Sequence, residues 1–428
     1  MTPATTPSVA PDRGLRDPDF VRLWKGETIS KAGTSLTSVV LPLIALQYLG
    51  ANTFMMGVLG ASIWLPWLIV GLPAGVWADR LRARPLMITC DIIAAVTFFT
   101  IPLGAWLGFL SMAHVLIVAV ITGCASVFFT AAYQTYVPFL VGKKHIFDAN
   151  ARLHATESGA MIVGPGVGTL IAQVTGAVLG LILDSITFLV SALYLSKIKV
   201  REPSKRGLDR RKRNIVAEIL DAIRFISRDA YLRVITVNVA AVNFCLGGVQ
   251  ALTVVFLVRV VGLGAWSFGA VIMAISVGGV LGSVLAPIAS KRMGAARALI
   301  VLNPICGVCT LMFGLADKGF GLALCLIGSA LWSAGAVLNF VISASFRQAY
   351  CPYEMLGRVA ASVRTLQYGM LPIGSLAAGV LGTVFDVRGA LWFFLFLNVF
   401  VRLILFIGPL KYSRDLPSER PEEARATS

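Results

Sequence analysis

Residues 75–84 read Gly75-Val76-Trp77-Ala78-Asp79-Arg80-Leu81-Arg82-Ala83-Arg84 and join two apolar segments, 54–78 and 85–107. Each segment is long enough to cross the ~30 Å hydrocarbon core of a membrane as a helix. Glycines at 71 and 75 let neighbouring helices approach closely. An acid beside fixed guanidinium groups can form ion pairs in one conformation and lose them in another. The stretch therefore predicts a short, charged connection between two membrane helices.

The composition of the whole chain agrees with a membrane protein. Of its 428 residues, 57% are hydrophobic and only 14% are charged, whereas soluble proteins average roughly 45–50% and about 25%. A mean hydropathy of +0.82 excludes a disordered chain, a coiled coil and a basic nucleic-acid binder. The sequence has no Gly-x4-Gly-Lys-Ser/Thr loop, so it predicts no ATP-hydrolysing site. We also expect no catalytic residue, no cofactor and no metal site.

Apolar runs of about 20 residues recur along the chain and set the expected fold. Because the runs are continuous rather than alternating, helices are favoured over the strands of a membrane barrel. We expect an all-α membrane protein with twelve transmembrane helices in two pseudo-symmetric six-helix halves. The predicted spans are 22–49, 54–78, 85–107, 112–138, 152–174, 176–197, 231–260, 266–290, 296–316, 320–346, 359–383 and 388–411.

The basic residues predict the orientation. With the N-terminus in the cytoplasm, the outer loops hold only Arg259, Lys318 and Arg388 of the 37 lysines and arginines. The stretch 197–233 alone carries twelve basic residues against five acids. This asymmetry follows the positive-inside rule. We therefore expect a multi-pass protein of the cell (inner or plasma) membrane with both termini cytoplasmic, in contact with the lipid bilayer and not with nucleic acid.

A weak internal repeat supports the division into halves. An offset of 206 residues matches Arg152, Gly168 and Leu170 to Arg358, Gly374 and Leu376. A duplicated half implies a two-fold axis along the membrane normal, with a substrate site between the halves near the midplane. The expected organisation is a cytoplasmic tail (1–19), an N-terminal half (20–197), a basic cytoplasmic linker (198–230), a C-terminal half (231–412) and a second cytoplasmic tail (413–428).

With these residues in view, the loop at 75–84 resembles the signature Gly-x-x-x-Asp-Arg-x-x-x-Arg of the major facilitator superfamily. The resemblance implies that Gly75, Asp79, Arg80 and Arg84 form a cytoplasmic gating latch that holds the outward-facing state. The corresponding loop of the second half, around Lys291, lacks the acid.

A second motif indicates the direction of transport. The span 152–174 contains Gly159, Gly164, Pro165 and Gly168. Proline removes a backbone donor and kinks a helix, and glycines allow a neighbouring helix to approach. This element resembles the Gly-Pro-x-x-Gly kink motif of exporters in the superfamily.

Further motifs resemble the drug:proton antiporter branch of the superfamily, which includes macrolide-efflux and siderophore-exporter types. Leu23-Trp24-Lys25-Gly26 is similar to the start of the first helix in that branch, and Leu183-Asp184-Ser185-Ile186-Thr187-Phe188 is similar to its sixth. Thr34 stands where many relatives carry an aspartate. The resemblance implies antiport of a drug-like substrate against protons.

Ionisable residues inside spans are costly and are therefore functional candidates. Glu27 and Lys31 are four residues apart, so they form either a neutralising pair or a proton-exchanging acid tuned by a lysine. Asp184 and Asp91 lie about two turns into their spans. We take Glu27, Asp184 and Asp91 as candidates for proton coupling. Arg364 and Arg402 are interpreted as snorkelling or pairing across the halves.

Neutral polar and aromatic residues within spans are candidates for the substrate cavity, although each can equally join helices structurally. Flat aromatic faces suit a bulky apolar ligand. The candidates are Gln47, Trp64, Tyr133, Gln134, Asn243, Gln250, Trp332, Asn339 and Gln367.

Together these features predict a secondary active exporter of a moderately hydrophobic small molecule (a drug, an antibiotic or a siderophore), proton-coupled and functional as a monomer. Two alternatives stay open at this point. One is an uptake carrier for a small metabolite, and the other is a non-transporting receptor or assembly protein on the same fold.

Overall fold

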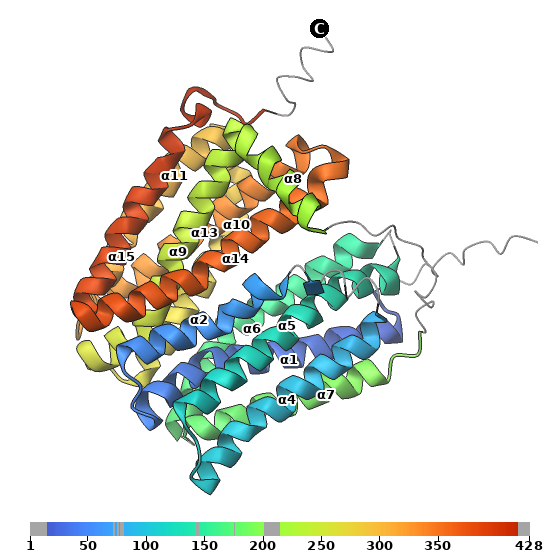
Figure 1. Ribbon diagram of the computed structural model, residues 1–428, viewed down its shortest axis with the longest axis vertical. Coiled ribbons are helices and arrows are strands. Elements are labelled where there is room, and N and C mark those ends of the chain that lie inside the picture. The colour runs from blue at the N-terminus through green and yellow to red at the C-terminus, as the bar shows by residue number, and fades with distance from the viewer. Residues whose placement is uncertain are drawn as a thin grey trace, which may run out of the picture.

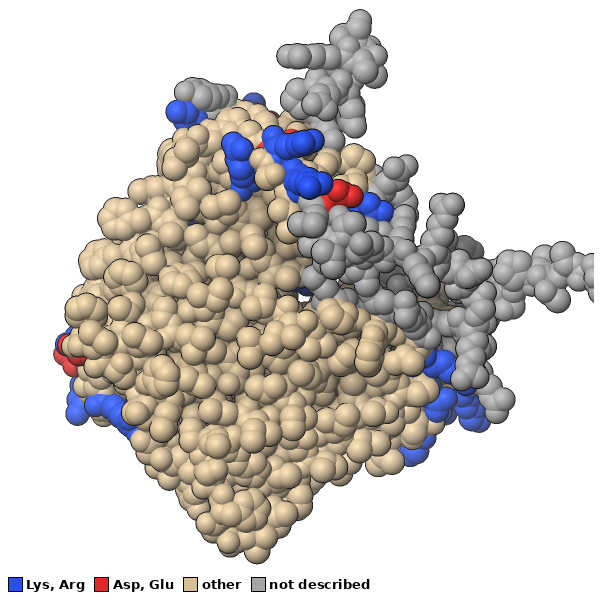
Figure 2. Space-filling view, in the orientation of Figure 1, with Lys and Arg blue, Asp and Glu red and all other residues tan. Residues whose placement is uncertain are grey.

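The computed structural model describes residues 15–71, 73–74, 77, 81–142, 145–174, 176–200 and 215–417. Within these ranges the chain is almost entirely helical and contains no strand. Nine of the described helices are each long and apolar enough to cross a membrane. Figure 2 shows charged residues at the ends of the molecule, with a broad uncharged band between them on the visible face. These observations confirm the predicted all-α membrane class.

The N-terminal half contains six of the predicted spans, each of which forms a helix. Its helices are α1 (Pro18–Leu43), extended by the π-helix η1 (Ile44–Tyr48), α2 (Thr53–Ile69), α4 (Ala83–Leu107), α5 (Met112–Val141), α6 (Ile146–Val174) and α7 (Ala177–Ser196).

The C-terminal half repeats this arrangement with the other six predicted spans. Its helices are α9 (Ala230–Val255), extended by the π-helix η3 (Phe256–Val260), α10 (Ala265–Met293), α11 (Ala295–Cys309) with α12 (Leu311–Gly314), α13 (Phe320–Tyr350), α14 (Tyr353–Val384), and α15 (Val387–Arg402) with two 3₁₀ turns, η4 (Leu403–Phe406) and η5 (Pro409–Tyr412).

One further helix, α8 (Ile215–Arg228), lies in the segment that we predicted only as a basic linker. Apolar residues at 219, 223 and 226 recur at helical spacing, so the helix is amphipathic. The helix packs against α9 and α14 at the end of the bundle where α7 ends and α9 begins (Figure 1). We call this end the linker end and the other end the opposite end.

Side-chain caps fix several helix starts. Asn52 accepts a hydrogen bond from the backbone nitrogen of Met55 at 2.8 Å. Asp229 accepts one from Leu232 at 2.9 Å. Such caps satisfy backbone donors that have no partner inside the helix. They also place the starts of α2 and α9 within a residue of the predicted span boundaries.

The connections at the opposite end repeat between the halves with an offset of 212 residues. Both α1 and α9 finish in a π-helical turn, and each turn is followed by a glycine with positive φ: 64° at Gly50 and 71° at Gly262. The Leu49 nitrogen donates to the Ile44 oxygen at 3.1 Å, and the equivalent bond in the second half is 2.9 Å long. This repeated backbone geometry is strong structural evidence for the pseudo-symmetric halves.

The halves contact each other through two equivalent helix pairs near the opposite end, α10 with α6 and α2 with α14, which lie side by side in Figure 1. A Cβ at Gly57 would lie 2.6 Å from the Gly379 Cα and 2.7 Å from the Ser375 oxygen. In the second pair, a Cβ at Gly269 would lie 2.7 Å from the Thr169 Cγ2. Both pairs therefore depend on a glycine that lets the backbones approach.

The buried apolar core is continuous at the opposite end and divided at the linker end. One cluster joins residues 39–46 of α1 and η1 to residues 249–257 of α9 and η3. At the linker end, one cluster lies wholly in the C-terminal half and another wholly in the N-terminal half. The structure is thus closed at the opposite end, and its two halves hold separate cores at the linker end.

Candidate functional site

A cavity of about 320 Å³ lies inside the N-terminal half, among α1, α2, α4, α5 and α7. Its wall carries two of the predicted coupling acids, Glu27 and Asp91, together with Lys31. Hydroxyl groups and aromatic rings make up much of the remaining wall. These lining residues include Ser30, Thr34, Thr37, Ser38, Trp64, Trp67, Phe98, Phe129 and Phe188.

Lys31 is held by two acids from different helices. Its Nζ lies 3.1 Å from an oxygen of Glu157 on α6 and 3.7 Å from an oxygen of Glu27 on α1. Glu157 also lies 3.3 Å from the Nδ1 of His154. When both acids are ionised and His154 is neutral, the cluster has one negative charge in excess. A proton or a cation would neutralise that charge.

Asp184 is fully buried between α7 and α1. Thr37 donates a hydrogen bond to one carboxyl oxygen, and Thr187 donates to the other at 3.2 Å. A Cβ at Gly33 would overlap both Asp184 and Thr187. Thr37 also lines the cavity, so one residue contacts both Asp184 and the cavity.

Asp91 on α4 is 2% exposed and lines the same cavity. Its Oδ2 has no hydrogen-bond partner among the described residues. The Ser191 side chain interacts with the Asp91 carboxyl group, but an ionised carboxylate with one unpaired oxygen is costly inside a membrane. Asp91 is therefore suited to hold a proton or to contact a polar group in the cavity.

A second cavity, of about 200 Å³, lies between the two halves and is lined by α2, the segment after it, α5 and α14. It shares Trp67 and Thr130 with the first cavity. Tyr368 of α14 contacts two rings of α2: its ring centroid is 5.6 Å from that of Trp64 and 4.9 Å from that of Trp67. The two cavities thus meet at an aromatic contact that joins the halves.

The family model for the Major Facilitator Superfamily matches residues 24–372. The chain belongs to the Major Facilitator Superfamily. It is therefore a membrane transporter for a small-molecule substrate and not an enzyme, as the sequence predicts.

Relatives with known roles include two efflux proteins. The chain is 25% identical to the "Multidrug efflux pump Tap" of Mycolicibacterium fortuitum over 358 residues, which cover 82% of this chain and 86% of the relative. It is 29% identical to "Macrolide efflux protein A" of Streptococcus pyogenes over 178 residues, or 39% of this chain and 43% of the relative.

Solved structures share the fold at low sequence identity. A bacterial homologue of the iron transporter ferroportin, in an inward-facing state, matches with a TM-score of 0.75 and 13% identity over 92% of this chain and 99% of that one. The nucleoside transporter NupG matches with a TM-score of 0.75 and 13% identity over 91% and 98%. These likenesses support the facilitator fold.

The glycines of the predicted kink motif lie on different faces of α6, which contains Pro165. Gly168 faces α1, where an added Cβ would lie 3.1 Å from the Leu36 Cα, and Gly164 faces Ser35 of the same helix. Gly166 faces Met273 of α10 in the other half. An added Cβ at Gly159 would meet no atom within 4 Å. The motif thus packs against both halves, whereas Gly159 faces open space.

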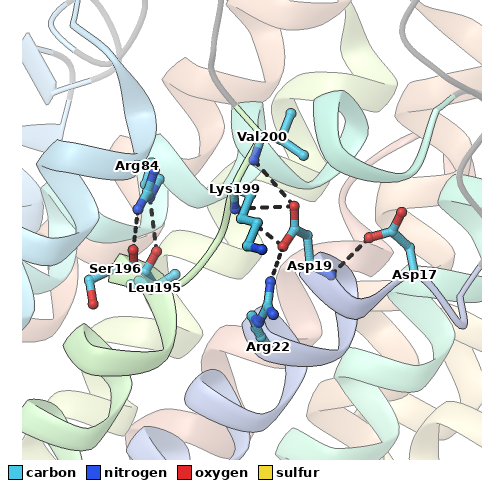
Figure 3. Close-up of polar contacts among 8 residues, drawn as sticks. All are labelled: Asp17, Asp19, Arg22, Arg84, Leu195, Ser196, Lys199 and Val200. Carbon is cyan, nitrogen blue, oxygen red and sulfur yellow. Dashed lines mark hydrogen bonds and ion pairs between the residues drawn. The ribbon is translucent and has the colours of Figure 1, made fainter.

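Of the predicted latch, Gly75, Asp79 and Arg80 lie outside the described residues, and Arg84 lies within them. The Arg84 Nε donates to the Leu195 oxygen at 2.9 Å, and its Nη2 donates to the Ser196 oxygen (Figure 3). A cation at this position caps the carbonyl end of α7. In this conformation Arg84 thus binds the end of a helix in its own half.

At the same end of the N-terminal half, the start of α1 contacts the segment that follows α7. The Asp19 carboxylate accepts hydrogen bonds from the Lys199 and Val200 nitrogens at 3.2 Å and pairs with Arg22 at 2.5 Å (Figure 3). These contacts fasten the first and last helices of the half to each other.

The predicted cavity residues divide into three groups. Trp64 lines the first cavity and Gln134 the second, so these two lie where the prediction requires. Gln47 and Gln250 are exposed, lie near the opposite end of the bundle, and belong to neither cavity wall. Tyr133 stacks on Phe129 with 6.2 Å between ring centroids and is likewise absent from both walls.

The other predicted cavity residues lie within the C-terminal half. Asn243 donates to the carbonyl of its own helix at Val239. Trp332 and Gln367 are buried, and each has a side-chain nitrogen without a hydrogen-bond partner among the described residues. Asn339 donates to Asn238 at 3.4 Å. None of these four lines either of the two cavities.

The C-terminal half contains a polar network that we did not predict from the sequence. Arg402, which we expected to snorkel or to pair across the halves, is fully buried within the C-terminal half. It donates to the Asn398 side chain at 3.3 Å and to the Asn303 backbone oxygen at 3.1 Å. Asn303 in turn donates to Asn238 at 3.3 Å. The network links α9, α11, α13 and α15. In the sequence it is indicated only by one asparagine in each of these four helices, and no local pattern shows that the four lie together.

Proposed function

We propose that this facilitator exports moderately hydrophobic small molecules in exchange for protons, by alternating access across the cell membrane. The observation that carries the proposal is the pair of adjoining cavities. One holds acids inside the membrane, and the other lies between the halves beside three aromatic rings. A transporter that couples two fluxes needs such groups close to one another.

The efflux direction is supported by the names of the relatives, a multidrug efflux pump and a macrolide efflux protein. The Pro165 motif supports the same direction, since Gly164 and Gly168 pack closely on α1 while Gly166 contacts the other half. A helix that contains a proline and contacts both halves is well placed to control their rocking. We take the linker end as cytoplasmic, in keeping with the distribution of basic residues.

The proposed coupling uses the excess negative charge of the N-terminal half. Glu27 and Glu157 share one lysine, and Asp91 has an oxygen without a hydrogen-bond partner in the described part of the chain. Asp184 is reached from the cavity through the hydroxyl of Thr37. A proton that enters the cavity can thus reach Glu27 and Asp91 directly and Asp184 through one hydroxyl.

The proposed mechanism alternates between two closures. In the present conformation the glycine contacts hold the halves together at the opposite end, so substrate enters from the linker end. After substrate binds, we propose that the loop around Asp79 closes the linker end. A proton taken up from the outside then resets the transporter.

An efflux assay tests the proposal. The chain is expressed in a host that lacks its own pumps, and cells are loaded with amphipathic fluorescent compounds of either charge, such as ethidium and fluorescein, and with a panel of macrolides. We expect accumulation to fall several-fold relative to cells with an empty vector, and an uncoupler to abolish the difference. Unchanged accumulation across the panel would contradict export, and a rise in accumulation would indicate uptake.

A further inference from the structure

The cavity between the halves has an electrostatic character of its own. Its described wall contains no acid, and its charged member is Arg364 on α14. Gln134 adds an amide, and Trp67 and Tyr368 add two rings.

Arg364 stands in this wall without a hydrogen-bond or ion-pair partner among the described residues. The residue is exposed. Tyr368 follows four positions later on the same helix, so the guanidinium and the ring lie on one face. The result is an open cation next to a flat aromatic surface.

A second arginine adds to the positive charge. Arg347 of α13 is 7% exposed, and its Nη1 has no hydrogen-bond partner among the described residues. Arg347 is close enough to Arg364 for the two like charges to repel each other. Arg347 lies outside the described cavity wall. Its charge adds to that of Arg364, and the described wall contains no acid to balance them, so an anion in the cavity would offset this positive charge.

The wall of the neighbouring cavity, in the N-terminal half, has a net charge of the opposite sign. There the charged groups are Glu27, Asp91 and Lys31, which sum to one negative charge when all are ionised. Trp67 belongs to both walls. A cation is therefore favoured on one side of this ring and an anion on the other.

We propose that the cavity beside Arg364 is a substrate subsite that selects flat, conjugated molecules carrying a carboxylate. The planar fork of the guanidinium matches the two carboxylate oxygens. The apolar ring system of the substrate stacks on Trp67 and Tyr368. This inference rests on the proposed export function, because it names the class of molecule that the cavity accepts.

Two dyes with one xanthene scaffold and opposite charge test the subsite. Fluorescein is anionic at neutral pH and rhodamine 123 is cationic. Binding of each to the purified full-length protein in nanodiscs is measured by fluorescence polarisation. We expect fluorescein to bind at least about tenfold more tightly than rhodamine 123, which is about 1.4 kcal/mol.

The variants separate the charge from the fold. Arg364→Ala should weaken fluorescein binding about tenfold or more and leave rhodamine 123 binding within about twofold. Arg364→Lys should restore part of the affinity, because lysine keeps the charge and loses the fork. Arg228→Ala on α8 removes an arginine outside the cavity and should change neither affinity. Size-exclusion profiles confirm that each variant is folded.

Three results overturn the inference: equal affinity for the two dyes, fluorescein binding that survives Arg364→Ala, or equal losses for both dyes in that variant. A guanidinium that only snorkels into water gives the second result. The efflux assay reports on the proposed function separately. If ethidium is exported but fluorescein does not bind, only the subsite fails. If fluorescein binds through Arg364 but no compound is exported, the export function fails.

Discussion

At the scale of single residues, the acids of the N-terminal half differ in what surrounds them. Asp184 is enclosed by hydroxyl donors from Thr37 and Thr187, with no cation in contact among the described residues. Glu27 instead contacts a lysine at 3.7 Å. A proton on Asp184 therefore removes an uncompensated charge, whereas a proton on Glu27 breaks an ion pair. This contrast makes Asp184 the stronger choice for the exchangeable proton.

We predict that Asp184→Asn abolishes proton-driven transport and leaves the protein folded. Asparagine has nearly the same shape and still accepts from a threonine hydroxyl, but it cannot release a proton. Efflux against a gradient should fall at least about tenfold, which is about 1.4 kcal/mol, while downhill substrate exchange in proteoliposomes continues.

Two further variants calibrate this prediction. Glu27→Gln should reduce proton-driven efflux less than Asp184→Asn does. Asp317→Asn, in a loop at the opposite end outside both cavities, should leave efflux unchanged. Full gradient-driven transport by Asp184→Asn would remove this carboxyl group from the mechanism.

A pair of glycines tests the packing beside that carboxyl group. Gly33→Ala places a methyl group against Asp184 and Thr187 and should destabilise the protein by about 1–3 kcal/mol. Gly159→Ala meets no atom within 4 Å and should be neutral or stabilising by up to about 1 kcal/mol, since alanine favours helix. Thermal unfolding of the purified proteins in detergent measures both. Equal melting temperatures in the two variants would contradict the close approach of α1 and α7.

Sequence could predict some of these contacts and not others. The spacing of Glu27 and Lys31 places them on one face of a helix, and the structure brings them within 3.7 Å. The shorter contact of Lys31 with Glu157 joins residues 126 positions apart. No local pattern specifies that pairing, because it depends on how α1 and α6 pack. The same holds for Arg402, whose partners lie on other helices as well as its own.

At the scale of helices, the contact between the halves depends on two glycines at equivalent positions. Gly57 of α2 faces Ser375 of α14, and Gly269 of α10 faces Thr169 of α6. Ser375 and Thr169 each donate a hydrogen bond to the carbonyl four residues earlier in their own helix. Their hydroxyls are thereby satisfied within the helix, and the glycine backbones can approach them closely.

We predict that Gly57→Ala shifts the protein toward states that are open at the opposite end. The added methyl group separates α2 from α14 only where they now touch, so the closed state loses contacts that the other state does not use. Spin labels at the exposed positions Tyr48 and Phe385 should report a longer distance component in this variant. Gly71→Ala, whose methyl group meets no atom within 4 Å, is the matched control. An unchanged distance distribution in Gly57→Ala would contradict this role.

The membrane-spanning helices could be predicted from the sequence, whereas the amphipathic helix α8 was not predicted. Each predicted span forms a helix because a long apolar run has no other way to satisfy its backbone inside a membrane. We interpreted 198–230 as a basic linker because it carries many charges, although its isoleucines recur at helical spacing. An amphipathic helix is defined by the arrangement of its residues and not by its composition, which is why a reading based on charge alone missed it.

At the scale of the whole molecule, the division of the core explains why the structure can have two states. The halves share one apolar cluster near the opposite end and keep separate clusters at the linker end. A rigid half with its own core can rotate without unfolding. The shared cluster and the hydrogen bond from Arg259 to the Leu46 oxygen, at 2.9 Å, must then be released when the opposite end opens.

This arrangement predicts that the two ends open and close reciprocally. Spin labels at Lys197 and Arg292 report on the linker end, and labels at Tyr48 and Phe385 report on the opposite end; all four positions are exposed. When the opposite end opens, the linker-end pair should move closer, because each half moves as one body. Acidification should shift both pairs in the wild-type protein and should shift neither in Asp184→Asn. Independent movement of the two pairs would show that the halves deform internally, and an equal pH response in the variant would assign the coupling proton to another acid.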